Sequence, residues 1–312
     1  MENYIIRKNI NNNFEYFTIN NIKIKDKIIL EKLKKIYIAP AYKDVKIYLD
    51  SDILATGINK AGRKQYIYSD KMKKMRELKK FNRLKILSKN IKKLKNKINT
   101  DLYEKSFTKK KLIALILKIM DLCNFRSGNK KYEKLYGSHG LTTLHKKHIL
   151  VKKNFIEIDF IGKKGVINNC IIKNKIIQTI IKKVYNMSSK EDPYLFSIKD
   201  NGKIIKILIT DINKYLEIFN ITSKDLRMWN ANIIFLKNLK NELNNTNDKK
   251  KLIRMAIKKT AASLHHTPAI CKSSYIFKKI IEDIENNNII INNLEKNSNI
   301  ENILKKFLYN KT

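Results

Sequence analysis

The 312-residue sequence is poor in the residues that break secondary structure or build covalent scaffolds, with 8 glycines, 3 prolines and 3 cysteines. The cysteines Cys123, Cys170 and Cys271 are scattered and form no C-x-x-C pair. This distribution argues against a disulfide scaffold and against a cysteine-based metal site. It suits a reducing compartment.

Long apolar runs are also missing, because no stretch reaches the roughly 18 residues that a transmembrane helix needs. The first ten residues lack the apolar block and the small-residue cleavage site of a signal peptide. We therefore expect a protein that is not secreted and has no membrane partner. With 43% hydrophobic residues, the chain can still build a substantial core.

Acidic residues are scarce too: 28 Asp and Glu stand against 67 Lys and Arg, a formal net charge of +39. Such a charge attracts polyanions, with nucleic acid first and anionic membranes second. Lys, Ile and Asn have AT-rich codons, so genomic drift is an alternative explanation for part of the basic excess.

The hydrophobic pattern predicts an α+β protein in two domains. A small antiparallel β domain occupies residues 1–76, and a larger, mainly α-helical catalytic domain with a small β-sheet occupies 77–312. Strands are predicted at 4–6, 14–19, 45–49, 53–56, 65–68, 155–161 and 166–172, the last two joined by a hairpin at 162–165. Helices are predicted at 71–97, 109–124, 173–186, 204–219, 223–240, 248–264, 273–287 and in a tail to about 310. Ser223 is predicted as the N-cap of the helix that holds Arg227.

Isolated residues supply what a tyrosine needs to attack a phosphodiester. The reaction requires a phenol nucleophile, at least two donors for the negative transition state, and an acid for the leaving oxygen. The candidate nucleophile is Tyr275, nine residues after His266. The other candidates are Arg126 after an apolar helix, Lys163 on the hairpin tip, and Arg227 with Lys224 on one helix face. Taken singly, each is more simply explained as packing, capping or solvated surface, and His265 is assigned to a capping turn.

Five short motifs occur in a fixed order along the chain. They are Gly62–Tyr68 (GRKQYIY), Arg126–Gly128 (RSG), Phe160–Lys163 (FIGK), Lys224–Arg227 (KDLR) and His266 through Tyr275. Together they resemble the type IB DNA topoisomerases, and closely the short poxvirus-type enzymes, over most of the length. Each motif alone would be weak; their joint occurrence is specific.

The resemblance implies an enzyme that forms a C-shaped clamp around duplex DNA and relaxes supercoils without ATP, metal or any cofactor. Tyr275 would form a transient 3′-phosphotyrosyl link, and the strand would rotate and be resealed. Arg126, Arg227 and His266 would stabilise the transition state, with Lys163 as general acid and Lys224 assisting. DNA contacts are implied for Arg63, Lys64, Gln65, Tyr66, Tyr68, Asn129, Lys131 and Tyr132. The implied partner is double-stranded DNA, bound by a monomer, in the virion and host cytoplasm.

The chain departs from the poxvirus pattern at two places. Asn129 stands where a basic residue is common, which leaves open whether a CCCTT-like cleavage preference is kept. Ser273 and Ser274 replace a common Arg-Ala pair. Two alternatives remain: a tyrosine recombinase, which usually carries H-x-x-R where this chain has Lys224-x-x-Arg227, and a catalytically inactive basic DNA-binding protein.

Overall fold

The computed structural model describes residues 4–188, 193–200, 202–286, 289–296 and 299–310. The chain divides into two compact units, residues 1–80 and 81–312, close to the predicted boundary after residue 76. Antiparallel sheets and a larger helical part give the α+β class that the sequence predicts. Within the described ranges, no helix has both the length and the apolar character that a membrane span requires.

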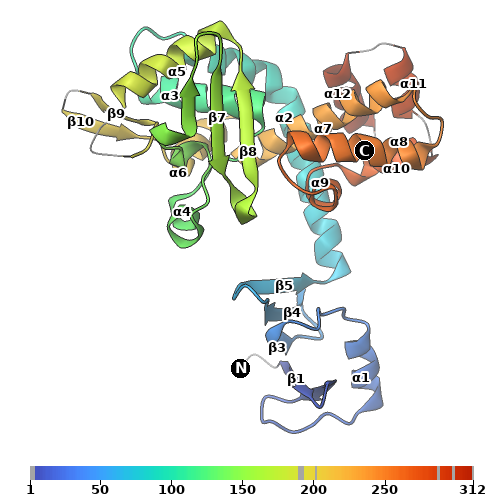
Figure 1. Ribbon diagram of the computed structural model, residues 1–312. Coiled ribbons are helices and arrows are strands. Elements are labelled where there is room, and N and C mark those ends of the chain that lie inside the picture. The colour runs from blue at the N-terminus through green and yellow to red at the C-terminus, as the bar shows by residue number, and fades with distance from the viewer. Residues whose placement is uncertain (1–3, 189–192, 201, 287–288, 297–298, 311–312) are drawn as a thin grey trace. The chain divides into compact units, whose positions relative to one another are not determined.

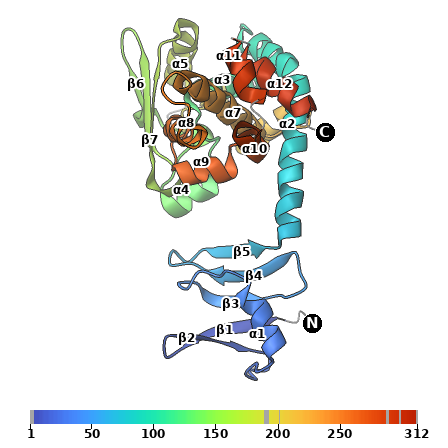
Figure 2. The ribbon, with the colours of Figure 1, turned by 90° about the vertical axis from the view of Figure 1, so that its right-hand side faces the viewer.

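The first unit is built on a five-stranded antiparallel sheet in the order β2-β1-β3-β4-β5 (Figure 2). The β1–β2 hairpin turns at Asn11 and Asn12, whose φ angles of 49° and 63° are left-handed. Asparagine tolerates that conformation better than most residues, so the Asn-rich turn forms as predicted. The strands are β1 Ile5–Ile10, β2 Asn13–Phe17, β3 Lys43–Ile47, β4 Ile53–Ile58 and β5 Lys64–Tyr68.

Helix α1 (Lys27–Lys34) was not predicted, because this region was expected to consist mainly of strands. Asp26 caps it by accepting hydrogen bonds from the backbone N–H groups of Ile28 and Ile29. Leu33 joins the core of the first unit with Val45 and Ile47. A helix this short depends on such tertiary packing and leaves little periodic signal in the sequence.

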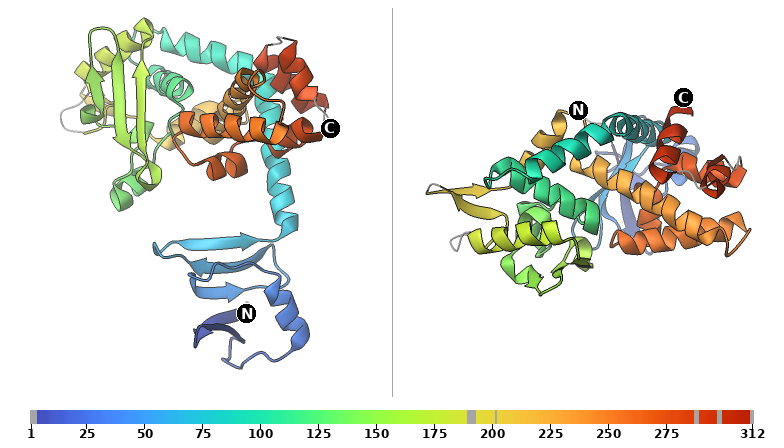
Figure 3. Two further views of the ribbon diagram at one scale, coloured as in Figure 1. Left: turned by 45° about the vertical axis from the view of Figure 1, so that its right-hand side comes forward. Right: turned by 90° about the horizontal axis from the view of Figure 1, so that it is seen from above.

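The second unit surrounds α3 (Lys109–Cys123), whose side chains Leu112, Leu115, Ile116 and Ile119 are fully buried. Helix α3 packs against β8, α5, α6 and α7, and α7 and α8 lie side by side (Figure 3). The predicted apolar helix at 109–124 is therefore confirmed, and it lies at the centre of this unit. The other helices are α2 Asp70–Leu102, α4 Lys130–Tyr136, α5 Lys175–Met187, α6 Ile209–Glu217, α7 Ser223–Glu242, α8 Lys249–Ser263, α9 Pro268–Ser274, α10 Lys278–Asn286, α11 Ile289–Glu295 and α12 Ile300–Asn310.

A three-stranded antiparallel sheet, β6 (Ile149–Val151), β7 (Ile156–Ile161) and β8 (Ile167–Ile172), forms one side of this unit (Figure 1). The β7–β8 hairpin closes with a 2.8 Å hydrogen bond from the backbone N–H of Gly162 to the carbonyl of Val166. Lys164 and Gly165 take left-handed φ angles of 65° and 74° at its tip. The hairpin predicted around Lys163 is thus confirmed.

Three predictions for the C-terminal half are wrong in part. A second hairpin, β9 (Ser197–Asp200) and β10 (Lys203–Lys206), takes the start of the helix predicted at 204–219. The helix predicted at 273–287 is broken between α9 and α10. Helix α7 is capped by Thr222 rather than Ser223, because Thr222 donates from its N–H and its hydroxyl to the Asp225 carboxylate, at 2.8 and 2.7 Å.

Cys123 and Cys170 form a disulfide that joins the end of α3 to β8. This overturns the sequence-based argument against disulfides, which rested on the scattered cysteines and could not see that residues 47 apart meet in the fold. Cys271 is free and buried.

We predict that Cys170→Ser lowers the free energy of unfolding of the oxidised protein by about 2–4 kcal/mol, because the open chain gains loop entropy when it unfolds. Urea denaturation with and without reductant measures the change. Reduced wild-type protein should match the variant, and denatured oxidised wild type should show a single titratable thiol, that of Cys271. A free energy of unfolding that is the same with and without reductant would contradict the prediction.

Candidate active site

Tyr275 lies at the end of α9, in the break between α9 and α10. Buried Asn232 of α7 holds this break, because its side-chain amide donates to the Tyr275 carbonyl and accepts from the Phe277 N–H, both at 3.0 Å. Sequence analysis missed Asn232. Its one signal was an asparagine within the apolar stretch of a helix.

The loop before α9 directs His266 toward the same tyrosine. His265 ends the preceding turn with a left-handed φ of 52°, and Thr267 caps α9 with Pro268 at its first position. The rings of His266 and Tyr275 stack, with centroids 4.7 Å apart and planes 18° from parallel. Of the two adjacent histidines, His266 is the one that contacts the tyrosine ring.

Arg227 is 4% exposed and lies one turn into α7. Its Nη2 donates to the carbonyl oxygen of Leu264, and its Cζ is 5.3 Å from the centroid of the Tyr275 ring. Nε and Nη1 of this guanidinium are buried and have no hydrogen-bond partner in the described part of the chain. Burial, together with the charge of Arg126, lowers the pKa of Arg227 to about 10, which leaves it protonated at neutral pH.

Arg126 begins a turn in which the backbones of two glycines, Gly128 and Gly140, lie in close contact. A Cβ on Gly140 would lie 2.5 Å from the Cα of Gly128 and 2.8 Å from the carbonyl oxygen of Arg126, so only glycine permits this crossing. The Leu141 N–H donates to the same carbonyl at 2.9 Å. The turn therefore sets where the Arg126 side chain begins.

The positive charges of Arg227 and Arg126 act on the hydroxyl group of Tyr275. Burial by itself raises the pKa of Tyr275, but the charges of Arg227 and Arg126 outweigh it, so the pKa lies below its ordinary value of 10. Burial, followed by the charge of Arg227, lowers the pKa of His266 to about 4, which makes this histidine neutral at pH 7. The structure thus brings together four of the predicted site residues: Arg126, Arg227, His266 and Tyr275.

Lys163 and Lys224 differ from this group in being exposed. Lys163 stands at the tip of the β7–β8 hairpin. Lys224 is in the first turn of α7, one turn before the buried Arg227. Exposed ammonium groups can approach a bound ligand from solvent, whereas Arg227 is buried and Arg126, His266 and Tyr275 are partly buried.

The predicted DNA-contact residues form two groups. On β5, Tyr66 and Tyr68 point to one side with ring centroids 6.3 Å apart, and Lys64 Nζ is 5.6 Å from the Tyr66 centroid. Between them, Gln65 donates to the carbonyl oxygen of Arg63 at 3.2 Å. An alternation of basic and aromatic side chains suits backbone contact and base stacking.

The second group lies around α4. Asn129 caps this helix by accepting a 2.8 Å hydrogen bond from the Lys131 N–H. Its side-chain oxygen is thus already engaged, which gives Asn129 a structural role beside the predicted one. Lys131 and Tyr132 are exposed on the first turn.

The sequence is similar to those of known proteins over most of its length. A family model described as the catalytic core of eukaryotic DNA topoisomerase I matches residues 69–302. A DNA topoisomerase 1B of Acanthamoeba polyphaga mimivirus is 32% identical over 87% of this chain and 84% of its own. The DNA topoisomerase 1B of vaccinia virus (strain Copenhagen) is 27% identical over 88% of each chain.

The partly buried His266 predicts that the stability of the protein falls at acid pH. Its pKa is about 4 in the folded protein and about 6.5 when unfolded. Between these values the unfolded chain binds a proton that the folded chain does not, so stability is fully present above pH 6.5 and falls toward pH 4. Urea unfolding at pH 7, 5.5 and 4.5 should show this decline, with a shallower slope in His266→Gln.

His265, whose pKa burial also lowers, should retain part of the slope in that variant. Tyr275→Phe keeps a ring against His266 and serves as the control with an unchanged slope. Equal slopes in wild type and His266→Gln would refute the assignment.

Proposed function

The chain belongs to the DNA topoisomerase I family and is a type IB DNA topoisomerase of the poxvirus type, and we propose that Tyr275 is its nucleophile. In the proposed step the Tyr275 oxygen bonds to phosphorus while the bond to the 5′ oxygen breaks. The products are a 3′-phosphotyrosyl link and a free 5′-hydroxyl. One ester replaces another, so the reverse reaction reseals the strand without ATP once it has rotated.

The observation that carries the proposal is the buried Arg227 guanidinium beside Tyr275, with Nε and Nη1 lacking partners in the described chain. Buried donors of this kind carry a large desolvation penalty unless an acceptor meets them. A phosphate oxygen is the acceptor that fits a guanidinium best. Arg126 would share the charge of the transition state, since it acts on the same hydroxyl.

The two arginines also prepare the nucleophile. A phenol attacks as its anion, and two fixed positive charges favour that anion even though the site is buried. The field of the two arginines thus lowers the proton affinity of Tyr275, whose phenolic proton passes to solvent as the bond to phosphorus forms.

His266 requires a proton before it can donate to phosphate. Its Nδ1 is 3.3 Å from the Thr267 carbonyl, which only accepts, so the single proton of the neutral ring belongs on Nδ1. Nε2 is buried and has no partner in the described part of the chain. We propose that the second proton is gained when DNA binds. A phosphate near Nε2 raises the pKa of His266, so that the protonated Nε2 becomes a hydrogen-bond donor.

Lys163 would supply the proton to the leaving 5′ oxygen, with Lys224 assisting. Exposure on a hairpin tip allows Lys163 to meet a strand that lies over the buried group. The residues of β5 and α4 would hold duplex DNA, as a clamp formed by residues 1–76 and 77–312. Action as a monomer, and presence in the virion and host cytoplasm, are further parts of this proposal.

Tyr275→Phe should abolish relaxation of supercoiled plasmid and the covalent protein–DNA adduct, while noncovalent binding persists. Arg227→Ala should slow cleavage by about 10²–10³, the usual loss for one preorganised donor to a transition-state oxyanion. Single-turnover cleavage of a labelled duplex measures both variants. Tyr103→Phe, which alters an exposed tyrosine outside the proposed DNA contacts, is the matched control. Adduct formation by Tyr275→Phe would assign the nucleophile elsewhere.

Lys163→Ala should slow cleavage of an ordinary duplex but much less that of a duplex whose leaving 5′ oxygen is sulfur. A thiolate leaves without a proton, so the acid becomes unnecessary. The same comparison for Lys224→Ala measures its share. If Lys163→Ala slows both substrates equally, Lys163 is not the acid.

A further inference from the structure

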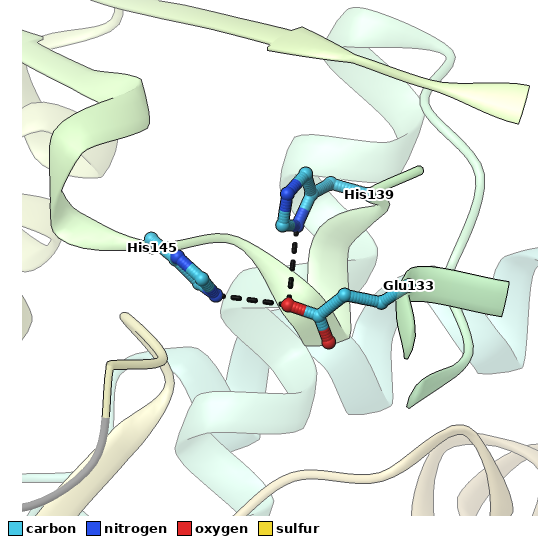
Figure 4. Close-up of side chains that lie close together, drawn as sticks. All are labelled: Glu133, His139 and His145. Atoms are coloured by element: carbon cyan, nitrogen blue, oxygen red, sulfur yellow. Dashed lines mark hydrogen bonds and ion pairs between the residues drawn. The ribbon is translucent and has the colours of Figure 1, made fainter. Parts of the chain in front are cut away.

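Three side chains converge in a second cluster, outside the group around Tyr275. The potential ligand atoms of Glu133, His139 and His145 all lie within 4.8 Å of one another (Figure 4). Glu133 Oε1 is 2.9 Å from His145 Nε2 and 3.4 Å from His139 Nδ1. With His148, this region holds every histidine of the chain except His265 and His266.

We propose that Glu133, His139 and His145 bind a divalent transition metal of the zinc class. Two imidazoles and one carboxylate are a donor set that zinc accepts, with water as a fourth ligand. Ligands at 2.0–2.1 Å from a tetrahedral ion lie about 3.3 Å apart. The two measured distances, 2.9 and 3.4 Å, lie on either side of that value, so small side-chain shifts would admit the ion.

Surrounding groups hold these ligands as outer-shell partners do in metal sites. The Tyr194 hydroxyl donates to Glu133 Oε2 at 2.7 Å, which leaves Oε1 facing the imidazoles. The backbone N–H of His145 donates to His148 Nδ1 at 3.0 Å, which fixes the chain at the ligand. The side chains of Glu133, His139 and His145 are 14%, 12% and 20% exposed, so the cluster is sheltered but reachable.

One hydrogen bond must change when the metal binds. His139 Nδ1 is 2.8 Å from the Thr143 carbonyl, an acceptor, so Nδ1 carries the proton. Coordination through Nδ1 replaces this bond, and the ring proton moves to Nε2 as the neutral tautomer changes.

The position of the cluster suggests what the metal would do. The backbone N–H of His139 donates to the carbonyl of Ile161 at 2.8 Å, and Ile161 is two residues before Lys163. Close by, the Leu141 N–H donates to the carbonyl of Arg126. A metal on Glu133 and His139 would restrict the motion of segment 139–141, which is hydrogen-bonded both to the Arg126 turn and to the strand that precedes Lys163. Its role is to position these elements, and the transesterification itself still needs no metal.

This proposal departs from the sequence-based prediction that the protein holds no metal. The spacing Glu-x5-His-x5-His matches no zinc signature with a known mechanism, such as two histidines one helical turn apart. The cluster forms because a short helix, a loop and a turn fold back on one another.

The test uses untagged full-length protein, stripped with a chelator and titrated with Co²⁺ and then Zn²⁺. We expect one Co²⁺ per chain, visible d–d absorption, displacement by one Zn²⁺, and a higher melting temperature with Zn²⁺. His145→Asn and Glu133→Gln should weaken binding by more than about tenfold. His265→Asn is the control and should bind normally, since asparagine suits the left-handed φ of 52° there.

X-ray absorption of the zinc-loaded wild type keeps the test decisive if a variant fails to fold. Scattering from imidazole and oxygen ligands is expected. A sulfur ligand, the absence of saturable one-to-one binding, or unaltered affinity in both ligand variants would overturn the site. An equal loss in His265→Asn would place the metal at the tyrosine site and also overturn it. None of these outcomes bears on Tyr275 as the nucleophile.

Discussion

The site depends on a guanidinium that is buried with no carboxylate partner among the residues that the structure describes. Arg227 is 4% exposed, and its described hydrogen bond goes to a backbone carbonyl at the end of α8. Taking such a charge out of water is costly, and an acidic partner would offset the cost but occupy the donors. The fold instead leaves the donors turned to a tyrosine whose pKa they lower. In the proposed mechanism, activation of the nucleophile and recognition of phosphate are then two effects of one positive charge.

The rest of the second unit can be understood as support for that arrangement. Asn232, one turn beyond Arg227 on α7, fixes the backbone at Tyr275, so one helix positions both the cation and the proposed nucleophile. Gly128 and Gly140 cross without side chains and set the turn that presents Arg126. Preorganisation of this kind keeps reorganisation during the reaction small.

Local signals made much of this predictable. The Asn-rich turn at Asn11, the apolar face of α3 and the β7–β8 hairpin follow from composition and period, and the demands of phosphoryl transfer singled out Arg227 and Tyr275. Long-range contacts made the rest unpredictable. The break at Tyr275 depends on Asn232, 43 residues earlier in the chain. The disulfide and the Glu133 cluster likewise join residues with no shared local pattern.

Separating the two histidine groups has a physical consequence. In the proposed mechanism His266 gains its second proton when phosphate binds, and a metal ion beside it would oppose that protonation and compete for the same phosphate oxygens. At Glu133 a metal would instead act through the backbone, since His139 contacts the strand that leads to Lys163. A bound ion there could stiffen the exposed hairpin without adding charge to the buried tyrosine group. The two proposals are therefore compatible: a metal at Glu133 would support the geometry of the domain without taking part in the reaction at Tyr275.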